Sequence, residues 1–172
     1  MMEGMGSKSI ENCLRGLILA NKFASERRKE QADPPPWFHR LGFVPQLRKS
    51  GELLWVSLKV IPLKEPYVAS ARPEGDRLRV GPNSEVKGLS TAIMRSWSKR
   101  CADETSEPRV CAMGTQNVAT AVRALARCLK EMNARKGLAR LFVCAPEMLP
   151  EVLENGQEVT MTQIRLEMRP RG

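Results

Sequence analysis

The stretch from Val110 to Arg127 constrains the fold of this chain more than any other part of the sequence. Its first four residues, Val110 to Met113, form a short apolar run that predicts a buried strand. Gly114 permits a sharp turn out of that strand, and Thr115 is the expected N-cap of a following helix. Apolar residues then recur at helical spacing at Val118, Ala121, Val122, Leu125, Leu129 and Met132. The stretch therefore predicts a strand, a glycine turn and an amphipathic helix.

Basic residues occupy another face of that helix, where Arg123, Arg127 and Lys130 repeat every three or four residues. The unpaired amides and the dipole of a helix start favour an anion such as a phosphate. The residues expected to contact a nucleic-acid backbone here are Gly114, Thr115, Gln116, Asn117, Arg123 and Arg127. The alternative is an ordinary strand–helix unit with solvated arginines, because charged helix faces are common.

Other elements are expected on both sides of this unit. A helix begins at Ser7 or Ser9 and runs to about Gln31, where prolines 34–36 start an extended connector. The aromatic stretch 37–44 has no clean period and is expected to be a loop that docks on protein or on RNA, with protein favoured. In residues 53–63 the apolar side chains of Val56, Leu58 and Val60 recur at every second position, which predicts a strand.

From Arg77 onward the expected order is β-α-β-α-β-β. The elements are a strand at 77–80, a helix capped by Asn83 or Ser84, the central unit, a strand at 140–145 ended by Pro146, a loop at 147–156, and a strand at 159–168 whose shift of phase predicts a bulge. Two helices on one face of a small mixed sheet make a two-layer α/β sandwich. We therefore expect a domain at 77–172 and, at 1–76, an N-terminal extension of helix, proline-rich connector, aromatic loop and strand.

The chain is strongly basic, with a net charge of +9 and a sequence pI near 9.7 over 172 residues. This balance favours an anionic partner, with nucleic acid first and acidic membrane second. The positive charge is spread over both halves of the chain, so folding must assemble the basic surface.

The reactive residues argue against catalysis. Five cysteines without a C-x-x-C pair indicate a reducing compartment and neither a disulfide framework nor a zinc site. His39 is the single histidine, and residues 114–117 lack the Gly-Lys-Ser/Thr of a phosphate-binding loop. We expect no enzyme activity, no cofactor and no metal.

The sequence leaves the compartment open. It has no apolar run long enough to span a bilayer, so no membrane partner is expected. Residues 7–29 are amphipathic and basic, which leaves a mitochondrial address open beside the cytoplasm.

The C-terminal part of the chain resembles the stage V sporulation protein S (SpoVS) family of the Alba-like superfamily, over roughly Leu78 to Arg171. The resemblance rests on Ala112-Met113-Gly114 and on the run from Ala121 to Arg127 at the family's spacing. Weaker similarities to the family are found at Pro82-Asn83-Ser84, Val143-Cys144-Ala145-Pro146, Asn155-Gly156-Gln157-Glu158 and Arg169-Pro170-Arg171. The resemblance implies an Alba-like nucleic-acid-binding fold that is commonly dimeric and has no known catalytic residues.

The chain departs from that family pattern at three places. The loop after the first strand lacks the usual lysine, for which Lys87 and Arg79 are the expected substitutes. Gln116 stands in place of a second glycine, and residues 1–76 have no counterpart in the minimal family.

Three functions follow as expectations. The first is a non-catalytic nucleic-acid-binding protein, RNA rather than DNA, acting as a structural subunit of a ribonucleoprotein such as a mitochondrial ribosome, with residues 1–76 contacting other subunits. The second is a protein-interaction scaffold that has lost nucleic-acid binding. The third is a DNA-binding, compacting protein of the Alba-like kind. Salt dependence separates phosphate binding from an apolar interface.

Overall fold

The computed structural model describes residues 1–30, 38–65, 67, 71–134 and 140–170. The described residues form three helices and one sheet of seven strands in the order β1-β3-β2-β6-β7-β5-β4. Their bounds are β1 Met2–Gly4, α1 Ser7–Glu30, β2 Arg40–Ser50, β3 Leu53–Leu63, β4 Arg77–Val80, α2 Val86–Asp103, β5 Arg109–Ala112, α3 Thr115–Ala134, β6 Arg140–Val152 and β7 Glu158–Pro170. The chain is therefore a mixed α/β fold, as predicted.

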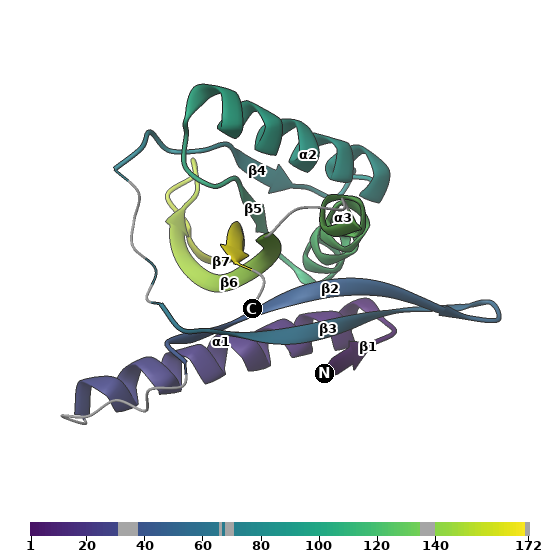
Figure 1. Cartoon of the computed structure of the whole chain (residues 1–172), viewed down its shortest axis with the longest axis horizontal. Coiled ribbons are helices and arrows are strands. Elements are labelled where there is room, and N and C mark those ends of the chain that lie inside the picture. Colours follow the sequence, from purple (N-terminus) through teal and green to yellow (C-terminus); the bar gives the residue numbers. More distant parts are fainter. Residues whose placement is uncertain (31–37, 66, 68–70, 135–139, 171–172) are drawn as a thin grey trace.

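The second half of the chain has the predicted order β-α-β-α-β-β, formed by β4, α2, β5, α3, β6 and β7. β4 runs parallel to β5, whereas β5 and β6 each pair antiparallel with β7. Figure 1 shows α2 and α3 on one side of these strands. This part of the sheet is mixed, and helices cover one of its faces.

Helix α3 lies at the centre of the molecule, in contact with α1, α2, β2, β4, β5 and β6. Ala119, Ala121 and Ala124 are fully buried, and their small side chains let the neighbouring elements approach closely. Val122 and Leu125 are also fully buried and fill the core between α3 and the strands. The apolar stripe predicted for this helix is confirmed.

The N-terminal segment adds three strands to the same sheet. β2 and β3 form a long antiparallel hairpin, and β1 pairs with β3 over Met2–Gly4. The register between β2 and β6 consists of Phe43 opposite Cys144. The predicted helix at 7–31 is confirmed by α1, which buries Ile10, Leu14 and Leu17 in the core. The expected boundary at residue 76 thus falls between two groups of strands that share one sheet.

One segment that was expected to be a loop belongs to a strand instead. The aromatic stretch 37–44 enters β2 at Arg40, and Phe43 and Val44 are buried. Consecutive residues of a strand lie on opposite faces, so both faces of β2 are covered at this point. The alternation of apolar and polar residues that identifies a strand is therefore missing, which explains the wrong prediction. Trp37 and the proline-rich connector lie outside the described residues.

Strand β6 continues through Pro146 to Val152, although the sequence predicted its end at that proline. Beyond Cys144 the described register of β6 is with β7 alone, and a strand paired on one side tolerates proline. The loop expected at 147–156 is therefore confined to the turn between Val152 and Glu158.

The bulge expected in the last strand is absent from the described ladder. The register of β6 with β7 is continuous from Arg140 opposite Pro170 to Val152 opposite Glu158. Ile164 and Leu166 belong to the helix-covered core, while Gln163 and Glu167 are buried on the other face. The apparent slip of phase arises because both faces of β7 are covered.

Candidate nucleic-acid interface

The turn into α3 has the predicted geometry. Gly114 has a φ of +84°, a backbone conformation that residues other than glycine rarely adopt. The amide of Val118 donates to the Gly114 carbonyl at 3.0 Å and closes the first helical turn. Met113, expected at the buried end of the strand, is 44% exposed because β5 already ends at Ala112.

Thr115 does not cap the helix as predicted. It is the first helical residue, and its hydroxyl donates at 2.8 Å to Glu11 Oε2 of α1. Asn83 and Ser84 are not caps either, since Glu85 precedes α2 and Ser84 Oγ accepts a hydrogen bond from the Gly81 amide. In both places the side chain finds a partner outside its own helix.

Helix α1 brings its own anion to the start of α3. Glu11 is 6% exposed and is contacted by Lys8 at 2.9 Å, by Arg15 at 2.8 Å and by Thr115. Hydrogen bonds from Lys8 and Thr115, together with the charge of Arg15, lower the pKa of this carboxyl to about 2 despite burial. A protein carboxylate therefore lies at the turn where the sequence predicts a phosphate.

The other two side chains at the helix start also have partners. Gln116 Oε1 accepts a hydrogen bond from the Ser7 hydroxyl at 2.7 Å, and Asn117 Nδ2 donates to the Met113 carbonyl at 2.9 Å. The structure brings Gly114, Gln116 and Asn117 together at one turn, in contact with the beginning of α1.

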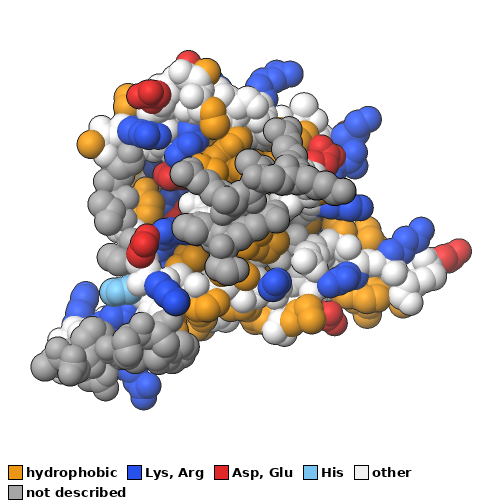
Figure 2. Space-filling view, in the orientation of Figure 1, with side chains coloured by type: hydrophobic (Ala, Val, Ile, Leu, Met, Phe, Trp, Pro, Cys, Tyr) orange, Lys and Arg blue, Asp and Glu red, His pale blue; other side chains and the backbone are white. Residues whose placement is uncertain are grey.

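The exposed stripe of α3 runs away from this turn through Arg123, Arg127 and Lys130. Arg127 and Lys130 are exposed and Arg123 is half-buried. In the part of the chain that the structure describes, none of the three has an ion-pair partner. We call these three residues the α3 stripe. Figure 2 shows Lys and Arg side chains on the side of the molecule between α2 and the projecting β2–β3 hairpin.

A groove lies next to the far end of the α3 stripe. It has a volume of about 350 Å³ and separates the last turns of α3 from the outer half of β2. Lys130 stands on its helical wall and Arg48 on its strand wall. Sequence reasoning missed this groove because residues 37–44 were expected to be a loop; the adjacent pair Arg48-Lys49 was the available signal.

The two residues expected to replace the missing lysine lie elsewhere. Arg79 of β4 forms an ion pair with Glu151, while its neighbours Leu78 and Val80 face the helix-covered core. Since side chains alternate along a strand, Arg79 lies on the face opposite α3. Lys87 is exposed on α2, where it borders a shallow depression with Arg95 and Thr91.

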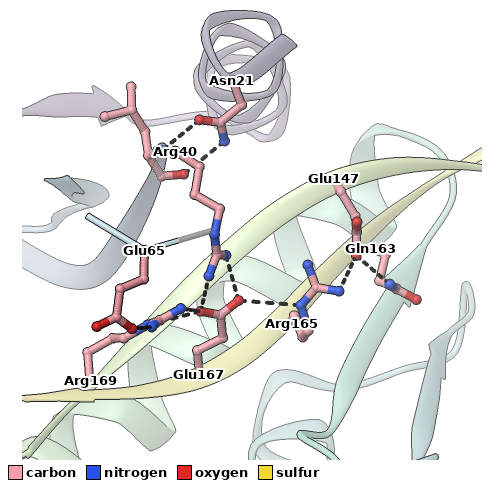
Figure 3. Close-up of polar contacts among 9 residues, drawn as sticks. Asn21, Arg40, Glu65, Glu147, Gln163, Arg165, Glu167 and Arg169 are labelled. Atoms are coloured by element: carbon pink, nitrogen blue, oxygen red, sulfur yellow. Dashed lines mark hydrogen bonds and ion pairs between the residues drawn. The ribbon is translucent and has the colours of Figure 1, made fainter. Parts of the chain in front are cut away.

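The sheet face opposite α2 and α3 carries a second group of arginines (Figure 3). Arg40 donates two hydrogen bonds to Glu167, at 2.6 and 2.7 Å, and Arg169 donates a third at 2.7 Å. Arg165 pairs with Glu147 at 3.0 Å and lies over the ring of Tyr67 at 3.5 Å. We call Arg40, Glu147, Arg165, Glu167 and Arg169 the outer-face network.

Glu167 is the centre of this network. Its side chain is 4% exposed, and that burial acts to raise its pKa. Hydrogen bonding and charge from Arg40, followed by Arg169, outweigh burial and hold the pKa below its usual value. The arginines here are neutralised by buried or half-buried carboxylates and form a structural unit.

The described residues contain no cluster of three or more His, Cys, Asp or Glu side chains arranged to hold a metal ion. His39, the single histidine, contacts Arg28 Nη1 through its Nδ1 at 2.9 Å. None of the described helices is both long and apolar enough to cross a membrane.

No protein-family model matches the chain, and neither a curated protein nor a solved structure matches it significantly. The resemblance to the SpoVS family accordingly stays a prediction from the sequence.

Proposed function

We propose that this chain is a non-catalytic nucleic-acid-binding protein that contacts phosphates through the α3 stripe, with RNA favoured over DNA. The observation that carries the proposal is the contrast in pairing. Among the described residues the arginines of the outer-face network all have carboxylate partners, whereas Arg123, Arg127 and Lys130 have none. Cations left without partners on a rigid, central helix are suited to a polyanion.

The net charge of +9 and the resemblance to the Alba-like superfamily support the same proposal. In this view Gly114, Gln116 and Asn117 border the interface, while Glu11 keeps the phosphates away from the helix start itself. The phosphate path follows the exposed stripe of α3. Arg79 and Lys87 lie outside it.

We further propose that the chain is a subunit of a ribonucleoprotein, such as a mitochondrial ribosome, in which α1 and the β2–β3 hairpin contact neighbours. Leu19 and Phe23 on α1 are 52% and 62% exposed, and Leu53 on the hairpin is 60% exposed. These side chains suit contacts with other subunits. They also support the alternative function, a protein scaffold without nucleic-acid binding, as does the carboxylate of Glu11 at the start of α3.

The experiment is binding of the purified chain to single-stranded RNA, double-stranded RNA and duplex DNA over a series of salt concentrations. Three phosphate contacts predict that log K falls with log salt at a slope of about −2 for a single strand. A slope of this size with tighter binding of RNA supports the proposal. Tighter binding of duplex DNA supports the compacting role, and the absence of binding at low salt leaves the scaffold.

A matched pair of variants locates the site. Arg123→Ala with Arg127→Ala removes two charges from the α3 stripe, and Lys87→Ala with Arg95→Ala removes two from the exposed face of α2. An equal loss of affinity in both would show that net charge alone, rather than the α3 stripe, binds the nucleic acid.

A further inference from the structure

The groove between α3 and β2 extends the basic surface into a half-enclosed site. Its volume of about 350 Å³ falls within the range of small-molecule pockets, about 300–1,000 Å³. The residues that line it are Val44, Pro45, Gln46, Leu47, Arg48, Ala126, Leu129, Lys130, Asn133 and Ala134. Most of these are apolar, and the charged ones are both cationic.

The walls of the groove belong to a helix and a strand. Val44 and Leu129 are buried and anchor the two sides in the core, while Leu47 is 39% exposed at the rim. The amide of Asn133 is held by the backbone of Phe142, which donates to Oδ1 at 2.9 Å. These contacts hold the two walls of the groove in place in the described structure.

Charge limits what the groove can hold. Arg48 and Lys130 face it from the strand wall and the helical wall, and no carboxylate lines it among the described residues. Gln46 Oε1 accepts a hydrogen bond from Arg48 at 2.8 Å, which orients that guanidinium at the rim. An apolar floor between two cations fits a flat, uncharged ring attached to an anionic chain.

The groove also continues the α3 stripe. Arg123 and Lys130 are seven residues apart, which corresponds to about 10 Å along a helix. A strand whose phosphates follow Arg123 and Arg127 therefore reaches the groove at Lys130.

We infer that the groove receives unpaired nucleobases of a single-stranded RNA whose backbone lies along the α3 stripe; this inference rests on the proposed function. Bases in a duplex face their partners and cannot turn into such a site, whereas those of loops and single strands can. The guanidinium of Arg48 offers a plane for a base to stack on, and the apolar floor accepts any base. The occupant is thus single-stranded rather than double-stranded RNA.

The test compares two substitutions of the same kind on the same hairpin. Leu47→Asp places a carboxylate on the rim of the groove, and Leu53→Asp places one at an exposed position that does not line it. Binding of fluorescent single-stranded RNA and of a hairpin duplex is measured for both variants, and thermal unfolding verifies their fold. Ala134→Glu, on the helical wall, repeats the test at a second exposed position.

We expect Leu47→Asp and Ala134→Glu to weaken single-strand binding about tenfold, which is the loss of roughly one docked base, relative to Leu53→Asp. Duplex binding changes equally little in all three. If the wild-type chain binds single strands and duplexes alike, and Leu47→Asp behaves as Leu53→Asp, the groove inference is wrong and the α3 stripe remains the site. If the wild type binds neither RNA, the proposed function fails as well, and the groove is left for an apolar protein segment.

Discussion

The molecule has two surfaces rich in basic side chains, and they differ in what surrounds each charge. In the outer-face network Arg40 and Arg169 share the buried carboxylate of Glu167. On α3, Arg127 and Lys130 project from an exposed stripe with no carboxylate partner among the described residues. The first group stabilises the fold and the second is available to a ligand. A net charge therefore does not locate a binding surface until the carboxylates have been placed.

The largest expected effect comes from removing the carboxylate at the centre of the outer-face network. Glu167→Ala leaves half-buried arginines without their main partner and should lower the free energy of unfolding by about 3 kcal/mol. Glu65→Ala is the control, because Glu65 also pairs with Arg169, at 3.1 Å, but its side chain is 79% exposed. The ion pair between Glu65 and Arg169 should contribute less than about 1 kcal/mol to the free energy of unfolding. Equal losses in urea titrations of the two variants would contradict the distinction between a structural and an available arginine surface.

The next effect concerns the α3 stripe. Arg123→Ala with Arg127→Ala should weaken nucleic-acid binding about tenfold and reduce the magnitude of the salt slope by about 1.4 for a single strand. The stability of the fold should change by less than about 0.5 kcal/mol, because neither side chain has an ion-pair partner in the described structure. Fluorescence anisotropy and urea titration measure the two quantities. Unchanged binding would remove α3 from the interface.

A smaller effect is expected from the carboxylate that α1 brings to α3. The pKa of Glu11 is about 2 in the folded chain and near 4.5 when unfolded. Its stabilisation is therefore complete above about pH 4.5 and is lost as the pH falls toward 2. Because Lys8 and Arg15 are largely solvated, we expect a loss of about 1 kcal/mol after screening.

Unfolding of Glu11→Gln at pH 7 and pH 3 measures this contribution. The variant should be less stable than the wild type at pH 7, and the difference should shrink at pH 3. A constant difference between the two pH values would show that the charge of Glu11 does not supply this contribution.

The smallest effect is expected at Arg79. Its ion pair with Glu151, on the face opposite α3, should make Arg79→Ala change RNA affinity by less than about twofold. Arg127→Ala alone should lower the affinity by about threefold under the same conditions. A larger loss at Arg79 than at Arg127 would place the interface on the outer face of the sheet.

Much of the second half of the fold was predictable, because its signals are local. Gly114 marks the turn, and the stripe from Val118 to Met132 has a helical period that no strand shares. The order of strands and helices from Arg77 follows from such signals. The ends of β6 and the course of β2 could not be predicted from local signals. Pro146 and the aromatic stretch receive their strand conformation from neighbouring strands.

The candidate site was predictable in part. The spacing of Arg123 and Arg127 placed both on one polar face of α3, where the structure has Arg127 exposed and Arg123 half-buried. What no local pattern contains is the position of Glu11, which lies 104 residues before its partner Thr115. The same holds for the pairing of Arg79 with Glu151 and for Arg48 on the wall opposite Lys130. Contacts between distant segments decide which cations are neutralised.

β2 and β6 meet, in the described ladder, at the single register pair of Phe43 and Cys144. Backbone hydrogen bonds therefore add little across this seam, and burial of Phe43 together with the packing of α1 on α3 joins the two groups of strands. Regions held by side-chain packing across a sparse ladder tend to open as separate cooperative units. In native-state hydrogen exchange the amides of β2 and β3 should therefore form one set and those of β6 and β7 a slower one. The hairpin can then loosen from the rest while the four strands around α2 and α3 stay folded.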